Sequence, residues 1–205
     1  MSIRKLHSIS YIVFETERLY LALLKPGAAS FVADYYSRNR EFHKKWAQTQ
    51  DDAYYTPRMQ RKYLQMEYKD YVNSRLVPLF LFEKQAVHSS NLKVVGRISL
   101  FNIVYGGMRS GLIGYALDEN ACGKGYMTEA LRFLIKLAFE SIHLLRLEAD
   151  ILPYNVRSLE VIKRLGFVEE GVHRSFMEIN TKRQDHVCFS LLYEDYKEQK
   201  SKKKT

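Results

Sequence analysis

Residues 118–131 read DENACGKGYMTEAL, in which Gly123 and Gly125 flank Lys124 and a helix-like run follows at once. The first turn of a helix carries backbone amides without partners in the helix and a partial positive charge. Small residues in front of such a turn let an anion approach these amides, so the stretch fits a phosphate. The alternative is a tight glycine turn that only joins a strand to a helix, and the surrounding sequence must decide.

Two common phosphate motifs do not match this stretch. A Walker A loop needs Ser or Thr after Gly-Lys because that hydroxyl holds magnesium, whereas Lys124 is followed by Gly125. The dinucleotide pattern G-x-G-x-x-G has Thr128 in place of its third glycine, and the strands in front of it read as antiparallel rather than as a parallel unit. Neither motif explains the loop.

Composition points to one domain of modest size. The chain has 205 residues, of which 46% are hydrophobic, enough for one substantial core. No stretch approaches the ~20 consecutive apolar residues of a membrane span, and the start MSIRKLHSIS lacks the features of a secretory signal. We therefore expect a cytoplasmic protein that does not enter a membrane. Neither Cys122 and Cys188 nor the six histidines show a zinc spacing, so we expect no metal.

Positive charge is concentrated at the C-terminus. The formal net charge is +9, and residues 197–205, KEQKSKKKT, hold five lysines and one glutamate. A positive surface favours anionic partners such as phosphorylated cofactors or RNA. We expect residues 1–196 to form a single domain and residues 197–205 to be a disordered basic tail, with a weak RNA contact as the alternative role of the tail.

The first part of the chain predicts a strand, two helices and three further strands. Thr56 and Pro57 form a good helix start, because the threonine hydroxyl can cap free amides and proline loses no needed hydrogen bond at the first helical position. The three strands follow one another with short connections, as in an antiparallel meander. The predicted strands cover residues 17–24, 77–83, 93–101 and 112–119, and the helices cover 28–37 and 57–74.

The second part alternates helices with strands. Met127, Leu131 and Leu134 recur at helical spacing and predict an amphipathic helix after the glycine loop. Residues 145–151 alternate apolar and charged side chains, which is typical of a strand with one buried face. A helix over 158–165 and strands from 167 onward and over 185–192 complete a mixed α/β pattern.

The glycine loop, read as Asn120 to Gly125, is similar to the Q/R-x-x-G-x-G/A acetyl-CoA loop of the GNAT N-acetyltransferases, with Asn120 in place of Gln or Arg. The chain resembles the RimJ/RimL branch, the ribosomal-protein-alanine N-acetyltransferases, over most of residues 15–193. The matching segments are ETERLYL, ADYYSRNREFHKKW, LFNIVYGG, IGYALDENACGKGYMTEAL, LPYNVRSLEVIKRLGFVEEG and RQDHV. The resemblance implies the GNAT fold: a mixed, mostly antiparallel sheet with helices on both faces and a splay between strands 4 and 5.

The resemblance also implies a cofactor site for acetyl-CoA. Ser158 would protonate the departing thiolate and is the candidate catalytic residue, with an ordinary helix serine as the alternative. Cys122 as a covalent acetyl carrier competes with its reading as a plain loop residue. The implied cofactor-binding residues are Leu117, Gly123, Lys124, Gly125, Tyr126, Met127, Thr128, Asn155 and Ser158.

The implied acceptor is a primary amine, foremost the N-terminal α-amine of an alanine on a protein such as a ribosomal protein, acetylated by direct transfer. Asp118 or Glu119 could receive the amine's proton, although each also reads as a surface acid. Trp46, Asn102 and Tyr115 are the predicted acceptor-binding residues.

Two departures from the family pattern leave the acceptor open. Ala47 and Gln48 follow Trp46 where Trp-Glu-Pro is common, and Ala22 replaces a usual arginine. A small amine, such as an antibiotic or a polyamine, is therefore an alternative acceptor. A non-catalytic CoA-binding or ribosome-associated module is a further alternative.

Overall fold

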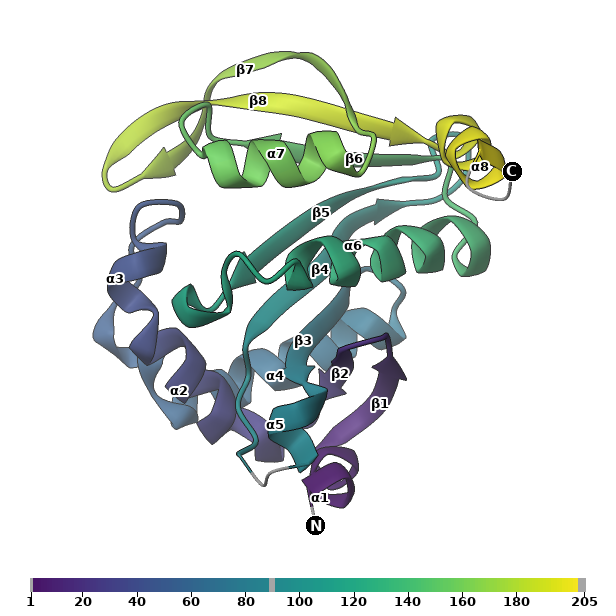
Figure 1. Ribbon diagram of the computed structural model, residues 1–205. Helices are drawn as coiled ribbons and strands as arrows, with labels where there is room; N and C mark the ends of the chain where they lie inside the picture. The colour runs from purple at the N-terminus through teal and green to yellow at the C-terminus, as the bar shows by residue number, and fades with distance from the viewer. Residues whose placement is uncertain (1, 89–90, 203–205) are drawn as a thin grey trace.

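The predicted strands join one mixed sheet, which we describe from a computed structural model covering residues 2–88 and 91–202. Within these residues the sheet has eight strands in the order β1-β2-β3-β4-β5-β6-β8-β7 (Figure 1). All neighbours run antiparallel except β5 and β6. The strands are β1 (Ser10–Glu15), β2 (Leu19–Leu24), β3 (Val77–Glu83), β4 (Gly96–Val104), β5 (Ser110–Leu117), β6 (Arg146–Ile151), β7 (Val168–Ile179) and β8 (Lys182–Leu192).

Strands β5 and β6 separate after a short pairing. In the described part of the chain they pair at three positions, the last of which joins Leu112 to Glu148. Strand β5 then continues to Leu117 against β4, where Gly96 faces Leu117. An unpaired strand edge leaves backbone N–H and C=O groups available to another molecule. This confirms the predicted splay between strands 4 and 5, which become β5 and β6 because β1 precedes them.

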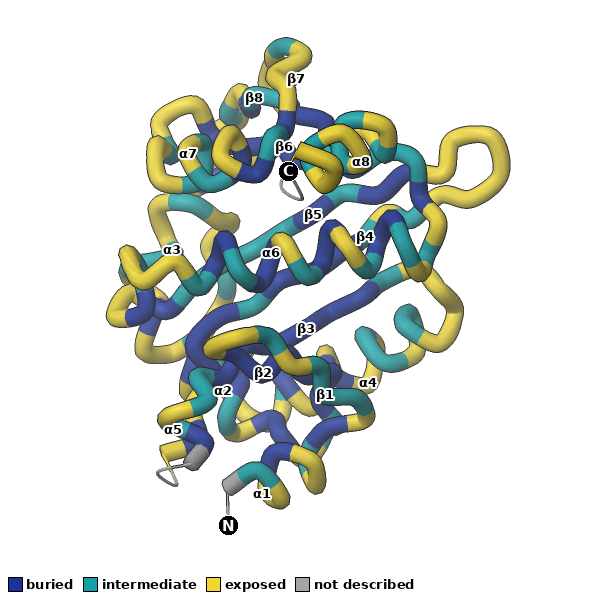
Figure 2. Tube along the Cα trace, turned by 45° about the vertical axis from the view of Figure 1, so that its right-hand side comes forward, coloured by how far each residue is buried: buried dark blue, intermediate teal, exposed yellow. Residues whose placement is uncertain are grey.

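Helices cover both faces of the sheet, as predicted. One core lies beneath α1, α2, α4 and α5 and includes Phe80 and Phe82 of β3. The other lies beneath α6 and α7 and includes Leu79 and Leu81 of the same strand. Figure 2 shows buried strand segments between the two helical layers. The helices are α1 (Ser2–Ser8), α2 (Ala29–Arg38), α3 (Arg40–His43), α4 (Pro57–Val72), α5 (Lys84–His88), α6 (Tyr126–Lys136), α7 (Val156–Arg164) and α8 (Tyr193–Lys202).

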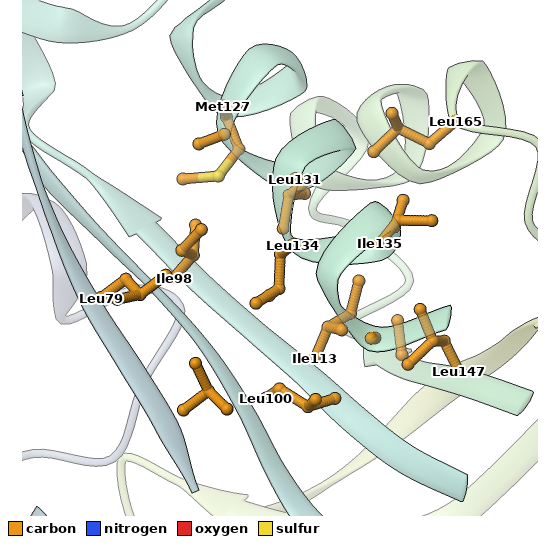
Figure 3. Close-up of a cluster of buried hydrophobic side chains, with 14 of the residues drawn as sticks. Leu79, Ile98, Leu100, Ile113, Met127, Leu131, Leu134, Ile135, Leu147 and Leu165 are labelled. Atoms are coloured by element: carbon orange, nitrogen blue, oxygen red, sulfur yellow. The ribbon is translucent and has the colours of Figure 1, made fainter. Parts of the chain in front are cut away.

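Helix α6 fixes the glycine loop to the sheet. Its residues Leu131 and Leu134 are fully buried and face Ile98 and Leu100 of β4 (Figure 3). Burying a side chain of this size contributes roughly 1.5–3 kcal/mol relative to leaving it exposed. The buried leucines therefore fix the position of helix α6, and of the loop in front of it, on the sheet.

Several elements differ from the sequence prediction, among them the four-residue helix α3. Helices α1 and α5 are too short to show a helical period, and strand β1 was not predicted although it pairs with β2. Helix α8 continues to Lys202, within the span predicted as a disordered tail, and Tyr196 of this helix donates a hydrogen bond to Glu140 (2.6 Å). Residues 203–205 lie outside the described part of the chain.

Candidate active site

The glycine loop has the backbone that an anion site needs. Gly123 and Gly125 both have a φ of +78°, and a side chain at Gly123 would meet no atom within 4 Å. The bond from the amide of Glu129 to the carbonyl of Gly125 opens helix α6. The three amides before it, those of residues 126–128, therefore have no acceptor in the helix. Open space beside free amides at a helix N-terminus fits a phosphate.

An arginine from the β1–β2 turn braces this loop. Arg18 donates from Nη1 to the carbonyl of Lys124 (2.8 Å) and from Nε to Glu129 (2.7 Å), and it lies over the ring of Tyr126. Glu129 also accepts from the hydroxyl of Thr16 (2.6 Å). Burial alone would raise the pKa of Glu129, but these donors hold it below its ordinary value. Sequence reasoning missed Arg18 because more than a hundred residues separate it from the loop.

A cavity of about 600 Å³ lies beside the open end of β5. It brings together six of the predicted residues: Trp46, Tyr115, Leu117, Met127, Asn155 and Ser158. Its walls come from α2, α3, the segment up to Tyr55, β4, β5 and the first turn of α7. The residues predicted to bind the cofactor at the strand end and those predicted to bind the acceptor thus share one space.

The start of α7 presents Asn155 and Ser158 to this cavity. Asn155 caps the helix, since its side-chain oxygen accepts from the amide of Ser158 (3.4 Å). The hydroxyl of Tyr115 on β5 donates to the carbonyl of Ser158 (3.2 Å), and burial raises the pKa of Tyr115 well above its ordinary value. Because the backbone of Ser158 makes these bonds, its side-chain hydroxyl is left for the cavity.

The other predicted residues lie outside the cavity wall. Lys124 pairs with Glu83 of β3 (Nζ to Oε1, 3.3 Å), and the side chain of Thr128 is buried under the helix. Asn102 does not join the acceptor residues: it is exposed, has a φ of +49° and lies at an irregularity of β4. The bulge turns its side chain away from the register that a regular strand would give.

The carboxylate of Asp118 is committed to structure. Its Oδ2 accepts from Arg38 Nε (2.6 Å) and Asn39 Nδ2 (3.1 Å), and its Oδ1 accepts from the amide of Asn120 (2.9 Å). Burial alone would raise the pKa of Asp118, but these bonds hold it below its ordinary value. Such a carboxylate is a weak base and is not among the residues lining the cavity.

The thiol of Cys122 lines the cavity but is not activated. Burial raises its pKa, and its Sγ lies 3.5 Å from the carbonyl of Asp118. A raised pKa lowers the fraction of thiolate, which is the form that attacks an acyl group. This environment favours the plain loop reading of Cys122 over an acetyl carrier.

Aromatic and charged side chains line the predicted acceptor side, among them Tyr36 and Arg97, which were not predicted. The ring of Tyr54 lies 5.0 Å from that of Tyr36, centroid to centroid. Arg97 of β4 bonds to Glu67 of α4 (2.6 Å), and burial raises the pKa of Glu67 although Arg97 opposes this. The signal missed in the sequence was the alternation of β4, which places Arg97 and Ser99 on the same face.

The turn of the β7–β8 hairpin lies beside the segment after α3 (Figure 1). The side chain of Asn180 in its turn donates to the carbonyl of Lys44 (2.9 Å) and accepts from the hydroxyl of Thr49 (2.5 Å). Thr49 and Lys44 both line the cavity. The hairpin therefore holds the segment after α3 in place over the acceptor side.

Residues 2–88 and 91–202 show neither a metal-binding group of side chains nor a helix suited to cross a membrane. In this part of the chain, no three His, Cys, Asp or Glu side chains are grouped so as to hold a metal ion. None of its helices combines the length and apolar character needed to cross a membrane.

Known acetyltransferases are similar to this chain over most of its length. The family model of the acetyltransferase (GNAT) domain matches residues 18–168, which is more than half of the chain. The probable N-acetyltransferase YjcK of Bacillus subtilis (strain 168) is 35% identical over 159 residues, covering 78% of this chain and 85% of that protein. The [ribosomal protein uS5]-alanine N-acetyltransferase of Escherichia coli (strain K12) is 29% identical over 181 residues, covering 88% and 91%.

A solved structure has the same fold. Mycobacterium smegmatis RimJ, in complex with CoA-disulfide, superposes with a TM-score of 0.80 at 21% identity, covering 86% of this chain and 83% of that one.

Proposed function

The chain belongs to the GNAT acetyltransferase family, and from this premise we propose that it acetylates the N-terminal α-amine of a protein whose first residue is alanine, a ribosomal protein being the foremost acceptor. The single observation that carries the proposal is the shared cavity, in which the start of α7 and the open end of β5 meet an aromatic acceptor wall. The alanine acceptor is supported by the similarity to the uS5-alanine enzyme over most of both chains.

Acetyl-CoA would be held along the glycine loop and the free edge of β5. Residues 123–128 offer amides and small side chains to its pyrophosphate, while Leu117 and Asn155 lie where the β5 and β6 strands diverge. When bound, acetyl-CoA supplies the acetyl group as a thioester. Lys124 and Arg18 lie beside the loop and are paired with Glu83 and Glu129, so the attraction for an anionic ligand comes from the free amides of the helix N-terminus.

Ser158 is the proposed acid for the departing thiolate. Its backbone is fixed by Asn155 and Tyr115, and the residue lines the cavity. A general acid of this kind contributes typically 10²–10⁴-fold to the rate. A fixed position matters because the hydroxyl must lie within hydrogen-bond reach of the sulfur when the bond to carbon breaks.

An α-amine suits this site better than a lysine side chain. The pKa of an α-amino group is about 7.7–8.0, whereas that of lysine is about 10.4, so a larger fraction of α-amine is neutral at pH 7. The site then needs to remove only one loosely held proton before attack. Trp46, Tyr36 and Tyr54 would pack against the first residues of the acceptor chain.

The test is a competition among acceptors. Purified protein is given acetyl-CoA and peptides that begin with Ala, Ser or Met, N-blocked lysine peptides, and free amines, and the release of CoA thiol is followed. We expect the highest kcat/KM with alanine peptides. Preference for free amines would support the small-molecule alternative, and acetyl-CoA binding without transfer to any acceptor would support a non-catalytic module.

The RNA contact of the basic tail and the cytoplasmic location stay predictions. Lys197 pairs with Glu194 (2.6 Å) and Lys200 with Glu140 (2.6 Å), so part of the tail's charge is neutralised within the domain. A phosphate contact through the tail would make RNA binding fall steeply with salt, and deletion of 197–205 would flatten that slope.

A further inference from the structure

One histidine lines the cavity, at the C-terminal end of the short helix α3. The Nε2 of His43 lies 2.7 Å from the carbonyl oxygen of Leu117. A carbonyl only accepts, so Nε2 carries the hydrogen and the neutral ring leaves a lone pair on Nδ1. Within residues 2–88 and 91–202, Nδ1 has no hydrogen-bond partner. His43 therefore presents an unprotonated nitrogen in a site that must remove a proton.

The bond to Leu117 places this ring at the diverging strands. The amide of Asp118 donates to Val95 on the β4 side, and the carbonyl of Leu117 belongs to the same trans peptide group, in which C=O and N–H point in opposite directions. The carbonyl of Leu117 thus faces the side of β6, beyond the last pairing of Leu112 with Glu148. His43 lies over the edge that would hold acetyl-CoA, in the cavity that Ser158 also lines.

The surroundings keep the ring of His43 neutral. Burial lowers its pKa below the ordinary 6.5, although the bond to Leu117 and the charge of Asp118 partly oppose this. From α2 the ring meets Tyr35 at 5.6 Å, and Arg38 neutralises Asp118.

The charged residues near His43 on its own segment have partners of their own. Arg40 pairs with Asp52 (2.8 Å) and Lys44 with Glu41 (3.8 Å). No unpaired carboxylate among these neighbours stabilises the imidazolium form.

The carboxylates near the cavity are engaged elsewhere or lie outside it: Glu119, which follows β5, is exposed and does not line the cavity. Asp118 is held by Arg38 and Asn39, Glu67 is paired with Arg97, and Glu41 is largely exposed beside Lys44. We propose that His43 is the general base of the transfer, taking the proton of the acceptor's ammonium group on Nδ1. This rests on the proposed function.

The protons balance in this scheme. The ammonium group loses two protons as it becomes an amide. One passes to His43 and then to solvent. Ser158 gives its own proton to the thiolate, and the second proton from the nitrogen replaces it on the Ser158 hydroxyl. The N–C bond forms as the C–S bond breaks.

The test compares His43→Gln with the wild type. The glutamine amide can still donate to the carbonyl of Leu117 but cannot accept a proton at neutral pH. We expect kcat to fall at least about 100-fold, with the Kd for acetyl-CoA within twofold of wild type. Wild-type kcat should decline as the pH falls through the folded-state pKa of His43, which burial places below the ordinary 6.5, and the variant should lack that decline. Free imidazole should restore part of the activity of His43→Ala.

The control is His186→Gln, the same change at a buried histidine of β8 that does not line the cavity, and it should keep wild-type kcat. Near-wild-type kcat in His43→Gln would overturn the proposal. Loss of acetyl-CoA binding together with activity, an unchanged pH profile and no imidazole rescue would also overturn it, because His43 would then only support Leu117. The His43 variants are assayed with whichever amine the wild type acetylates. If the wild type does not use alanine peptides, the proposed acceptor fails, but the role of His43 can still be tested with the amine that it does use.

Discussion

The hydroxyl of Tyr115 donates a hydrogen bond to the carbonyl of Ser158 at 3.2 Å, which joins β5 to the first turn of α7. These two elements belong to opposite sides of the gap where β5 and β6 no longer pair. The bond therefore fixes the width of the gap at the cavity. It also fixes the position of the Ser158 backbone relative to the open edge of β5.

Replacing Ser158 by alanine should remove the acid without disturbing the fold. The carbonyl that accepts from Tyr115 and the amide that bonds to Asn155 both belong to the backbone and remain. We expect kcat to fall about 100-fold while the Kd for acetyl-CoA stays within twofold. Steady-state kinetics of CoA-thiol release measure this. Ser141→Ala, at an exposed serine that does not line the cavity, is the control and should keep its kcat; equal losses in both variants would argue against a special role for Ser158.

Replacing Tyr115 by phenylalanine should loosen the gap. The ring still fills its place, but the donor to Ser158 is lost, so we expect the free energy of unfolding to fall by about 1 kcal/mol and kcat to fall severalfold. Chemical denaturation and initial rates give the two values. Tyr154→Phe, at an exposed tyrosine, should change neither. An unchanged kcat in Tyr115→Phe would mean that the bond does not position Ser158.

Replacing Arg18 by alanine should weaken acetyl-CoA binding. The variant loses the hydrogen bond from Arg18 to the Lys124 carbonyl and the ion pair between Arg18 and Glu129. The backbone of the glycine loop is then held less firmly. We expect the Kd for acetyl-CoA to rise about fivefold, measured by calorimetry. Arg132→Ala lies on the exposed side of the same helix and serves as the control. The same rise in both variants would show a general charge effect instead.

Replacing Asp118 by asparagine should cost stability in a pH-dependent way. The folded-state pKa of Asp118 is lowered, so its contribution is present above the ordinary value near 3.9 and is lost as the pH falls through the folded pKa. We expect the variant to be less stable by about 2 kcal/mol at pH 7, with the difference shrinking below pH 4. Thermal unfolding across pH 3–7 measures it. A difference that stays constant with pH would contradict this role of the carboxylate.

The periodic elements were predictable because their signal is local. The apolar positions of α6, the alternation of β6 and the Thr56 cap of α4 appear within a few residues, and the structure confirms each. The loop with Gly123 and Gly125 was equally visible, since its backbone requirement depends on those residues alone.

Long-range contacts were not predictable in the same way. Arg18 meets Lys124, and His43 meets Leu117, only after the sheet has formed. Asn102 lies away from the other predicted acceptor residues because a bulge in β4 breaks the alternation that its neighbours suggest. The tail was read as disordered from its charge, whereas its lysines find carboxylates such as Glu140 on the folded domain.

Locating the acetyl group on a peptide product tests the central claim most directly. The wild type is incubated with acetyl-CoA and a peptide that begins with alanine and contains one lysine, and fragmentation mass spectrometry identifies the modified nitrogen. The account predicts acetylation of the α-nitrogen of alanine, with the lysine unmodified. Acetylation of the lysine alone, or of neither amine while acetyl-CoA binds, would contradict it.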